Sequence, residues 1–144
     1  MAEKGTGGFT AEERDAMKER AAELRAEKGG KKAADALEDL LKKIAEMPDD
    51  QRVMAERIHA IVTEVAPQLA PKTWYGQPAW ADADGKPVVF FQAAAKFGTR
   101  YSTLGFQEEA KLDDGAMWPT SWAITALGAA EEKEIARLVK KAAG

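Results

Sequence analysis

The chain has 144 residues, of which 21 are Lys or Arg and 24 are Asp or Glu, giving a formal net charge of −3. This near-neutral balance excludes broad electrostatic capture of nucleic acid. The absence of cysteine excludes disulfides, thiolate metal sites and cysteine nucleophiles, and a single histidine excludes any two-histidine metal motif. No apolar run approaches the ~18 residues of a membrane span, and the first residues lack the apolar stretch of a signal peptide. We therefore expect a cytoplasmic, single-domain protein that binds neither nucleic acid nor membranes.

The first predicted helix begins at a capping box. Thr10 is followed three residues later by Glu13, and this hydroxyl–carboxylate pair can satisfy the unpaired amides at a helix start. Gly29 and Gly30 are a favoured C-terminal stop, so the helix is expected to run over 11–28. Its apolar stripe is thin, which is typical of a helix on the surface.

Two further helices are predicted before the aromatic part of the chain. Apolar residues at three- and four-residue spacing indicate a helix over 33–47, ended by Pro48. The next helix, over about 50–66, has the strongest apolar stripe of the chain, and Asp49 or Asp50 is expected to cap it.

The remaining residues are expected to form a small sheet and a closing helix. Ten of the eleven aromatic residues lie between Trp74 and Trp122, and aromatic residues favour strands. The Asp84–Gly85 pair predicts a hairpin, because glycine accepts a positive φ. One or two helical turns are expected over 107–112. The predicted strands are 73–80, 88–92, 99–104 and 121–125, and the closing helix covers 129–142.

These elements predict an α+β fold, in which a small antiparallel sheet of three or four strands packs on the helices near residues 50–66 and 129–142. Residues 1–47 are assigned to an N-terminal extension of two helices, and residues 48–144 to the α+β domain. The run Val88–Phe91 is apolar at four consecutive positions, so both faces of its strand should be covered. The N-terminal helices, an open cleft or a dimer interface are three alternatives for the second face.

Several short segments resemble the bacterial YdhG-like family, a domain of unknown function in which some members are described as frataxin-like iron chaperones. The resemblance covers about residues 50–141. It implies a frataxin-like or YdhG-like fold, no enzymatic activity, and ferrous iron as the cargo. The segments that carry it are Tyr75-Gly76-Gln77-Pro78-Ala79-Trp80, the turn at Gly85-Lys86, the strand Val88–Phe91 and Lys96.

Metal binding in this chain must use carboxylates, carbonyls and water, because cysteine is absent and only one histidine is present. These ligands suit hard cations. The alternative is that such acidic pairs serve only turns and caps. The residues predicted to bind iron are Asp82, Asp84, Glu108 and Glu109.

The second functional hypothesis is a non-enzymatic binding module, in which an aromatic cleft holds a small anionic molecule or a peptide. Alternation along a strand over 73–80 would place Trp74 and Trp80 on one face and Tyr75 and Gln77 on the other. The alternative is that the aromatic residues are ordinary core. No catalytic residue can be named, and a homodimer is allowed. The predicted ligand-binding residues are Trp74, Tyr75, Gln77, Trp80, Arg100 and Tyr101.

Overall fold

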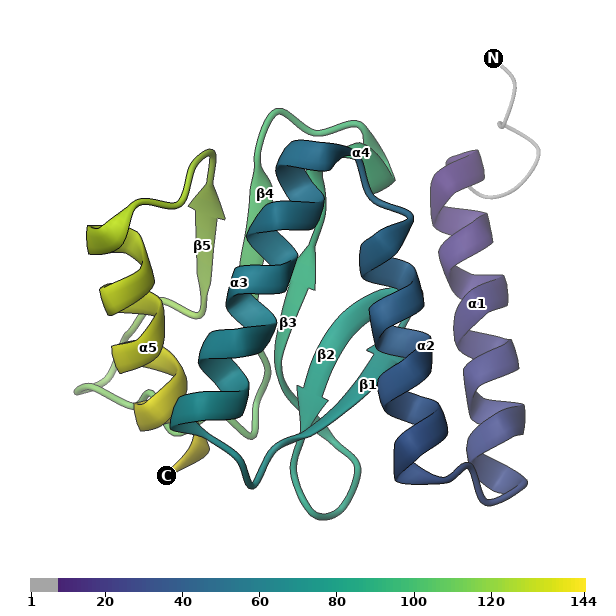
Figure 1. The fold of residues 1–144 in the computed structure, drawn as a ribbon, viewed down its shortest axis with the longest axis horizontal. Helices are drawn as coiled ribbons and strands as arrows, with labels where there is room; N and C mark the ends of the chain where they lie inside the picture. Colours follow the sequence, from purple (N-terminus) through teal and green to yellow (C-terminus); the bar gives the residue numbers. More distant parts are fainter. Residues whose placement is uncertain (1–7) are drawn as a thin grey trace.

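The computed structural model describes residues 8–144 and has an α+β fold with a five-stranded antiparallel sheet (Figure 1). The strands are ordered β1-β2-β3-β4-β5, so each strand pairs with the next one along the chain. The elements are α1 Ala11–Lys28, α2 Ala33–Ala45, α3 Asp49–Val65, β1 Ala70–Trp74, β2 Gln77–Ala81, β3 Pro87–Gln92, α4 Ala94–Phe97, β4 Ser102–Phe106, β5 Ser121–Ile124 and α5 Ala129–Ala143.

The helices largely follow their sequence signals. The capping box of α1 is confirmed, since Glu13 N donates to Thr10 Oγ1 at 3.0 Å and Thr10 N donates to Glu13 Oε1 at 2.9 Å. The cap predicted for α3 is wrong. Pro48 is the N-cap, and Asp49 and Asp50 lie within the first turn, where their charges favour the helix dipole.

The segment 73–80 is a hairpin and not one strand. Tyr75 and Gly76 have φ values of +55° and +73°, and they reverse the chain so that Trp74 pairs with Gln77. The single strand expected here is therefore two strands, β1 and β2, which raises the strand number to five. Because the turn changes the alternation, Trp74 and Trp80 lie on opposite faces of the sheet and not on one face.

Two other local predictions differ from the structure. The stretch 107–112 contains a single turn, closed by Ala110 N donating to Gln107 O at 2.9 Å, and no helix. The strand expected over 99–104 is β4, which starts only at Ser102 because a short helix, α4, and its exit at Gly98 precede it. The strands β3 and β5 and the helix α5 lie where the sequence predicts them.

Three helices, and not two, pack on one face of the sheet. Figure 1 shows α5, α3 and α2 side by side in front of the strands. Leu40 and Ile44 of α2 belong to the same buried cluster as the core residues of α3, α5 and the sheet. The domain boundary at residue 47 stays a prediction. Fully buried members of the core include Leu40, Ile58, Trp80, Phe91, Leu104 and Val139.

On the opposite face of the sheet, side chains of neighbouring strands pack against one another. None of the long helices among the described residues lies across it (Figure 1). The rings of Trp74 and Phe90 contact each other at a centroid distance of 5.3 Å. Phe90 in turn lies against Gly105, where an added Cβ would be only 2.3 Å from Phe90 Cζ. A small residue on β4 therefore lets an aromatic ring from β3 lie flat on the sheet.

We predict that Gly105→Ala lowers the free energy of unfolding by about 1–3 kcal/mol, because the new methyl group displaces the Phe90 ring. Urea denaturation measures the loss. Gly29→Ala is the matched control, since its φ is −78° and its new Cβ would come no closer than 3.4 Å to Ala26 O and 3.7 Å to Arg25 O. The double variant Gly105→Ala with Phe90→Ala should be more stable than the sum of the single losses predicts. Equal losses at Gly105 and Gly29 would contradict this packing.

Candidate functional site

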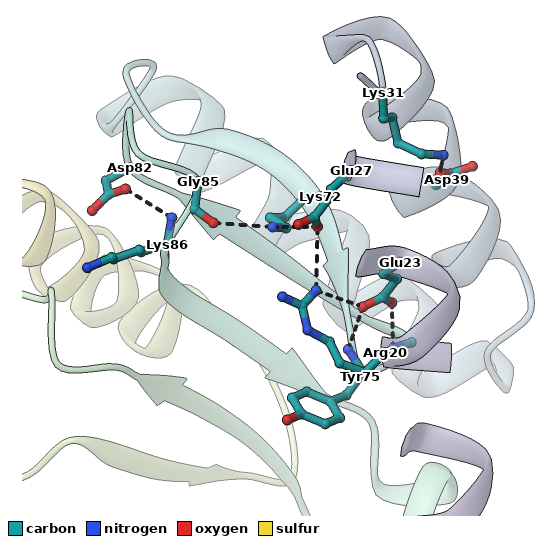
Figure 2. A network of polar contacts seen from close by, with 11 residues as sticks. Arg20, Glu23, Glu27, Lys31, Asp39, Lys72, Tyr75, Asp82, Gly85 and Lys86 are labelled. Carbon is teal, nitrogen blue, oxygen red and sulfur yellow. Dashed lines mark hydrogen bonds and ion pairs between the residues drawn. The ribbon is translucent and has the colours of Figure 1, made fainter. Parts of the chain in front are cut away.

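The β1–β2 turn presents two backbone donors to one carboxylate. Tyr75 N and Gly76 N each donate to Glu23 of α1, at 2.9 Å to Oε1 and 2.9 Å to Oε2 (Figure 2). Both turn residues have positive φ, and successive N–H groups in such turns form concave anion sites. The turn therefore has the geometry of a carboxylate receptor.

A second carboxylate lies beside the same turn. Glu19 accepts from Lys43 Nζ of α2 at 2.8 Å and from Lys96 Nζ of α4 at 2.9 Å. Its Oε1 lies 2.2 Å from the position of a Cβ added to Gly76, so it occupies space that only glycine leaves open. Elements far apart in the sequence thus surround one charged group.

A third glutamate of α1 continues the row. Glu27 Oε2 lies 2.8 Å from Lys72 Nζ of β1, and Lys72 also donates to Gly85 O at 3.2 Å. Arg20 NH1 lies between the carboxylates of Glu23 and Glu27, at distances of 3.3 Å and 3.4 Å (Figure 2). Carboxylates spaced by four residues share one helix face, and here each one meets a different set of donors.

The electrostatics of these contacts favour the ionised forms. Burial acts to raise the pKa of Glu19, but the hydrogen bonds from Lys43 and Lys96 outweigh it, and the pKa lies below its usual value. The pKa of Glu27 is lowered in the same way, with burial opposed by the hydrogen bond from Lys72. Burial acts to lower the pKa of Lys43, yet Glu19 raises it overall. The contacts at neutral pH are therefore charge-assisted.

Helix α1 packs loosely, and two hollows lie beside it. The larger, of about 650 Å³, lies among α1, α2 and β1, and small side chains such as Ala22, Ala26 and Ala36 line it. The smaller, of about 270 Å³, is lined in part by Glu19, Lys43, Gly76, Gln77 and Lys96. Ala16 is the one buried residue of α1. Charged contacts rather than core packing therefore hold this helix.

Gln77 is a polar residue that the fold leaves incompletely bonded. It is 5% exposed, and its Oε1 has no hydrogen-bond partner among the described residues. Its Nε2 donates to Trp74 O at 3.4 Å. A buried acceptor without a donor is costly, and Gln77 is one of the residues that line the smaller hollow.

The predicted ligand-binding residues are only partly together. Trp74, Tyr75 and Gln77 lie at the β1–β2 turn, and the Arg20 guanidinium is 6.0 Å from the centre of the Tyr75 ring. Trp80 is buried in the core on the other face. Arg100 and Tyr101 lie in the loop before β4, where the guanidinium is 5.2 Å from the Tyr101 ring centre. Of the six residues, Gln77 alone lines either of the two hollows.

The residues predicted to bind iron lie in two separate turns. Asp82 Oδ1 accepts from Asp84 N at 2.9 Å and from Lys86 N at 3.0 Å, so it organises the β2–β3 hairpin. Glu108 and Glu109 form the turn after β4. Within residues 8–144, no group of three or more Asp, Glu or His side chains is placed to hold a metal ion. The four residues therefore form no common cluster.

Sequence reasoning missed Glu19, Glu23, Lys43 and Lys96. The one available signal is the spacing of Glu19, Glu23 and Glu27, which puts three carboxylates on one face of α1. On a helix rich in Lys, Arg and Glu, that pattern is ordinary for a solvated surface. Only the tertiary structure brings Lys96 to Glu19, 77 residues away.

Comparison of the chain with models of protein families, with curated proteins and with solved structures finds no match in any of the three. The resemblance to the YdhG-like family therefore stays a prediction. Among residues 8–144, no helix has both the length and the apolar character needed to cross a membrane.

His59, the only histidine of the chain, is part of the core boundary. Trp80 Nε1 donates to His59 Nδ1 at 3.2 Å, and the two rings stack with an interplanar angle of 23°. Burial lowers the pKa of His59, which keeps the imidazole neutral and its Nδ1 free to accept. Protonation would remove this acceptor.

We predict that acid weakens the fold through His59. A lowered pKa in the folded state means that the unfolded chain binds this proton first, so stability is retained above the unfolded value of about 6.5 and declines as the pH falls below it. The free energy of unfolding, measured in urea between pH 7.5 and 5.5, should fall more for the wild type than for His59→Gln. A parallel decline in both proteins would contradict the assignment.

Proposed function

We propose that the chain is a binding module for carboxylate-bearing anionic ligands, and that the ligand binds at the β1–β2 turn. The turn site is defined here as the backbone N–H groups of Tyr75 and Gly76 together with the ammonium groups of Lys43 and Lys96. The observation that carries the proposal is the pair of N–H groups that bonds both oxygens of one carboxylate, at 2.9 Å each.

The donors of the turn site suit an anion for three reasons. Backbone N–H groups in a tight turn are fixed in direction, so they lose little freedom on binding. Lys43 and Lys96 add two positive charges at 2.8 and 2.9 Å from the neighbouring carboxylate. Gly76 leaves space for an oxygen atom where a side chain would stand. The carboxylates of α1 show the binding mode that a free ligand would copy.

The buried amide of Gln77 bears on which carboxylates the turn site would prefer. Its Oε1 accepts from no donor among the described residues, and the residue lines the smaller hollow beside Lys43 and Lys96. A ligand that carries an O–H or N–H group next to its carboxylate would satisfy this acceptor. We therefore expect hydroxy- or amino-carboxylates to bind more tightly than plain carboxylates of the same size.

The proposal predicts chemical rescue in the full-length Glu19→Ala, Glu23→Ala variant. Added acetate should shift the amide resonances of Tyr75 and Gly76 saturably in two-dimensional NMR. We expect a Kd on the order of 10 mM, because two charge-assisted hydrogen bonds contribute roughly 3 kcal/mol. The wild type should respond at least tenfold more weakly, since its own carboxylates occupy the donors.

Two controls separate site binding from a general effect of salt. Sodium chloride at the same ionic strength should not reproduce the shifts. Glu12→Ala, which removes an exposed glutamate from the first turn of the same helix, should leave the wild-type response unchanged. If acetate gives no saturable shift at Tyr75 and Gly76 in the double variant, the proposed function is wrong.

The iron-chaperone hypothesis stays a prediction drawn from the family resemblance. Its test is calorimetric titration of the full chain with ferrous iron. If iron binds near micromolar concentration, removing the charges of Asp82 with Asp84, or of Glu108 with Glu109, should weaken it. Equal heats for all variants, or no saturable heat, would overturn the predicted site.

A further inference from the structure

We infer that the turn site, extended by Lys72, is a surface that recognises an acidic helix, and that α1 occupies this surface as a competitor within the same chain. The inference rests on the proposed function and names its partner: a helical segment of another protein with carboxylates at every fourth residue. The helix-binding surface is defined as Lys43, Lys72, Lys96 and the N–H groups of Tyr75 and Gly76.

The spacing of the donors matches a helix. Glu19, Glu23 and Glu27 are successive fourth residues of α1, and such positions are about 6 Å apart along a helix axis. Each finds its own partners: Glu19 the ammonium groups of Lys43 and Lys96, Glu23 the two turn amides, and Glu27 Lys72. A small anion can satisfy one of these donor groups, whereas a helix with the same spacing satisfies all three at once.

Helix α1 is placed for release. Its apolar side chains contribute little, since Met17 and Leu24 are 39% and 46% exposed and Ala16 alone is buried. A hollow of about 650 Å³ lies among α1, α2 and β1, so the contact between α1 and these elements is incomplete. Its departure therefore leaves the main core of α2, α3, α5 and the sheet intact.

The linker between α1 and α2 and the charged contacts of α1 also favour exchange of α1 for a partner helix. Gly29 and Gly30 separate α1 from α2, and Gly30 has a φ of +81°, a conformation that favours glycine. Partly exposed ion pairs each contribute little to stability, and they weaken with salt. A partner helix therefore competes chiefly against the high local concentration of α1, which is in the millimolar range for a short flexible linker.

The surface that α1 covers is strongly positive once α1 leaves. Lys43, Lys72 and Lys96 then lose their carboxylate partners on α1. Among residues 8–144, the acid that still pairs with one of them is Glu46, 3.7 Å from Lys43. Three ammonium groups and two amide donors complement an acidic helix face and disfavour a basic one. The partner is thus identified by the chemistry of α1 itself.

The test uses the full-length Glu19→Gln, Glu23→Gln, Glu27→Gln variant and a fluorescent peptide with the sequence of residues 10–28. Fluorescence anisotropy should show that this variant binds the peptide at least tenfold more tightly than the wild type does, because its own α1 no longer competes. A peptide with the same three substitutions should not bind. Raising NaCl from 50 to 500 mM should weaken binding at least tenfold.

Two further arms test the surface and the spacing. Adding Lys43→Gln and Lys96→Gln to the triple variant should reduce peptide affinity at least tenfold, whereas Lys133→Gln on α5 should not change it. A peptide of the same composition, with its three glutamates moved off a common face, should bind at least tenfold more weakly. Circular dichroism and cooperative unfolding of each variant establish that it is folded.

The outcomes separate the inference from the proposed function. Acetate could shift the amide resonances of Tyr75 and Gly76 while the 10–28 peptide and its triple-substituted form bind equally. It could also do so while the 10–28 peptide binds the wild type and the triple variant equally. In either case the helix partner is wrong and the carboxylate site stands. If neither acetate nor peptide binds, both are wrong. If the wild type dimerises with rising concentration and the triple variant does not, α1 exchange between two copies replaces the partner protein.

Discussion

The left-handed backbone at Tyr75 and Gly76 sets the geometry of both the core and the candidate site. Two consecutive residues with φ near +55° and +73° reverse the chain within two residues, and the register Thr73–Pro78 follows directly. A non-glycine residue in this region costs roughly 1–2 kcal/mol, so the surrounding contacts must hold Tyr75 in place. The same geometry directs two neighbouring N–H groups toward α1. One local constraint thus places Trp80 among the helices, Trp74 on the opposite face, and both amides at Glu23.

The one-sided arrangement of the helices explains why α1 is held by charges. The sheet packs α2, α3 and α5 on one face, and the rings of Trp74 and Phe90 contact each other on the other face. Helix α1 lies outside this core, and Ala16 is its one buried residue. Strand β1 is at the edge of the sheet, however, and an uncovered edge invites pairing with other chains. Helix α1 contacts this strand through Lys72 and the turn that follows, so it covers an edge without joining the core.

The sequence predicts most elements because their signals are local. The capping box of Thr10 and Glu13, the apolar stripe of α3 and the Asp84–Gly85 hairpin all depend on neighbours within a few residues. The prediction of a single strand over 73–80 was wrong, because tyrosine is not expected at positive φ. Gly76 alone is too weak a signal to predict a turn within an aromatic strand. Because of that single error, Trp74 and Trp80 were predicted on one face of the sheet, whereas they lie on opposite faces. The site needed contacts over 24 to 77 residues of sequence separation, which periodicity does not encode.

Holding a helix by ion pairs makes its attachment depend on conditions in a way that core packing does not. The lowered pKa values of Glu19 and Glu27 mean that these carboxylates stabilise the docked helix above their unfolded pKa of about 4.3, and that this contribution is lost as the pH falls through the folded values. Salt screens the same contacts, whereas it does not screen the packing of the apolar core. Release of α1 therefore requires no unfolding of the domain. It requires a competing helix whose carboxylates are better placed to bind the same donors. A surface that already binds a carboxylate helix within its own chain is, by the same contacts, able to recognise one from outside.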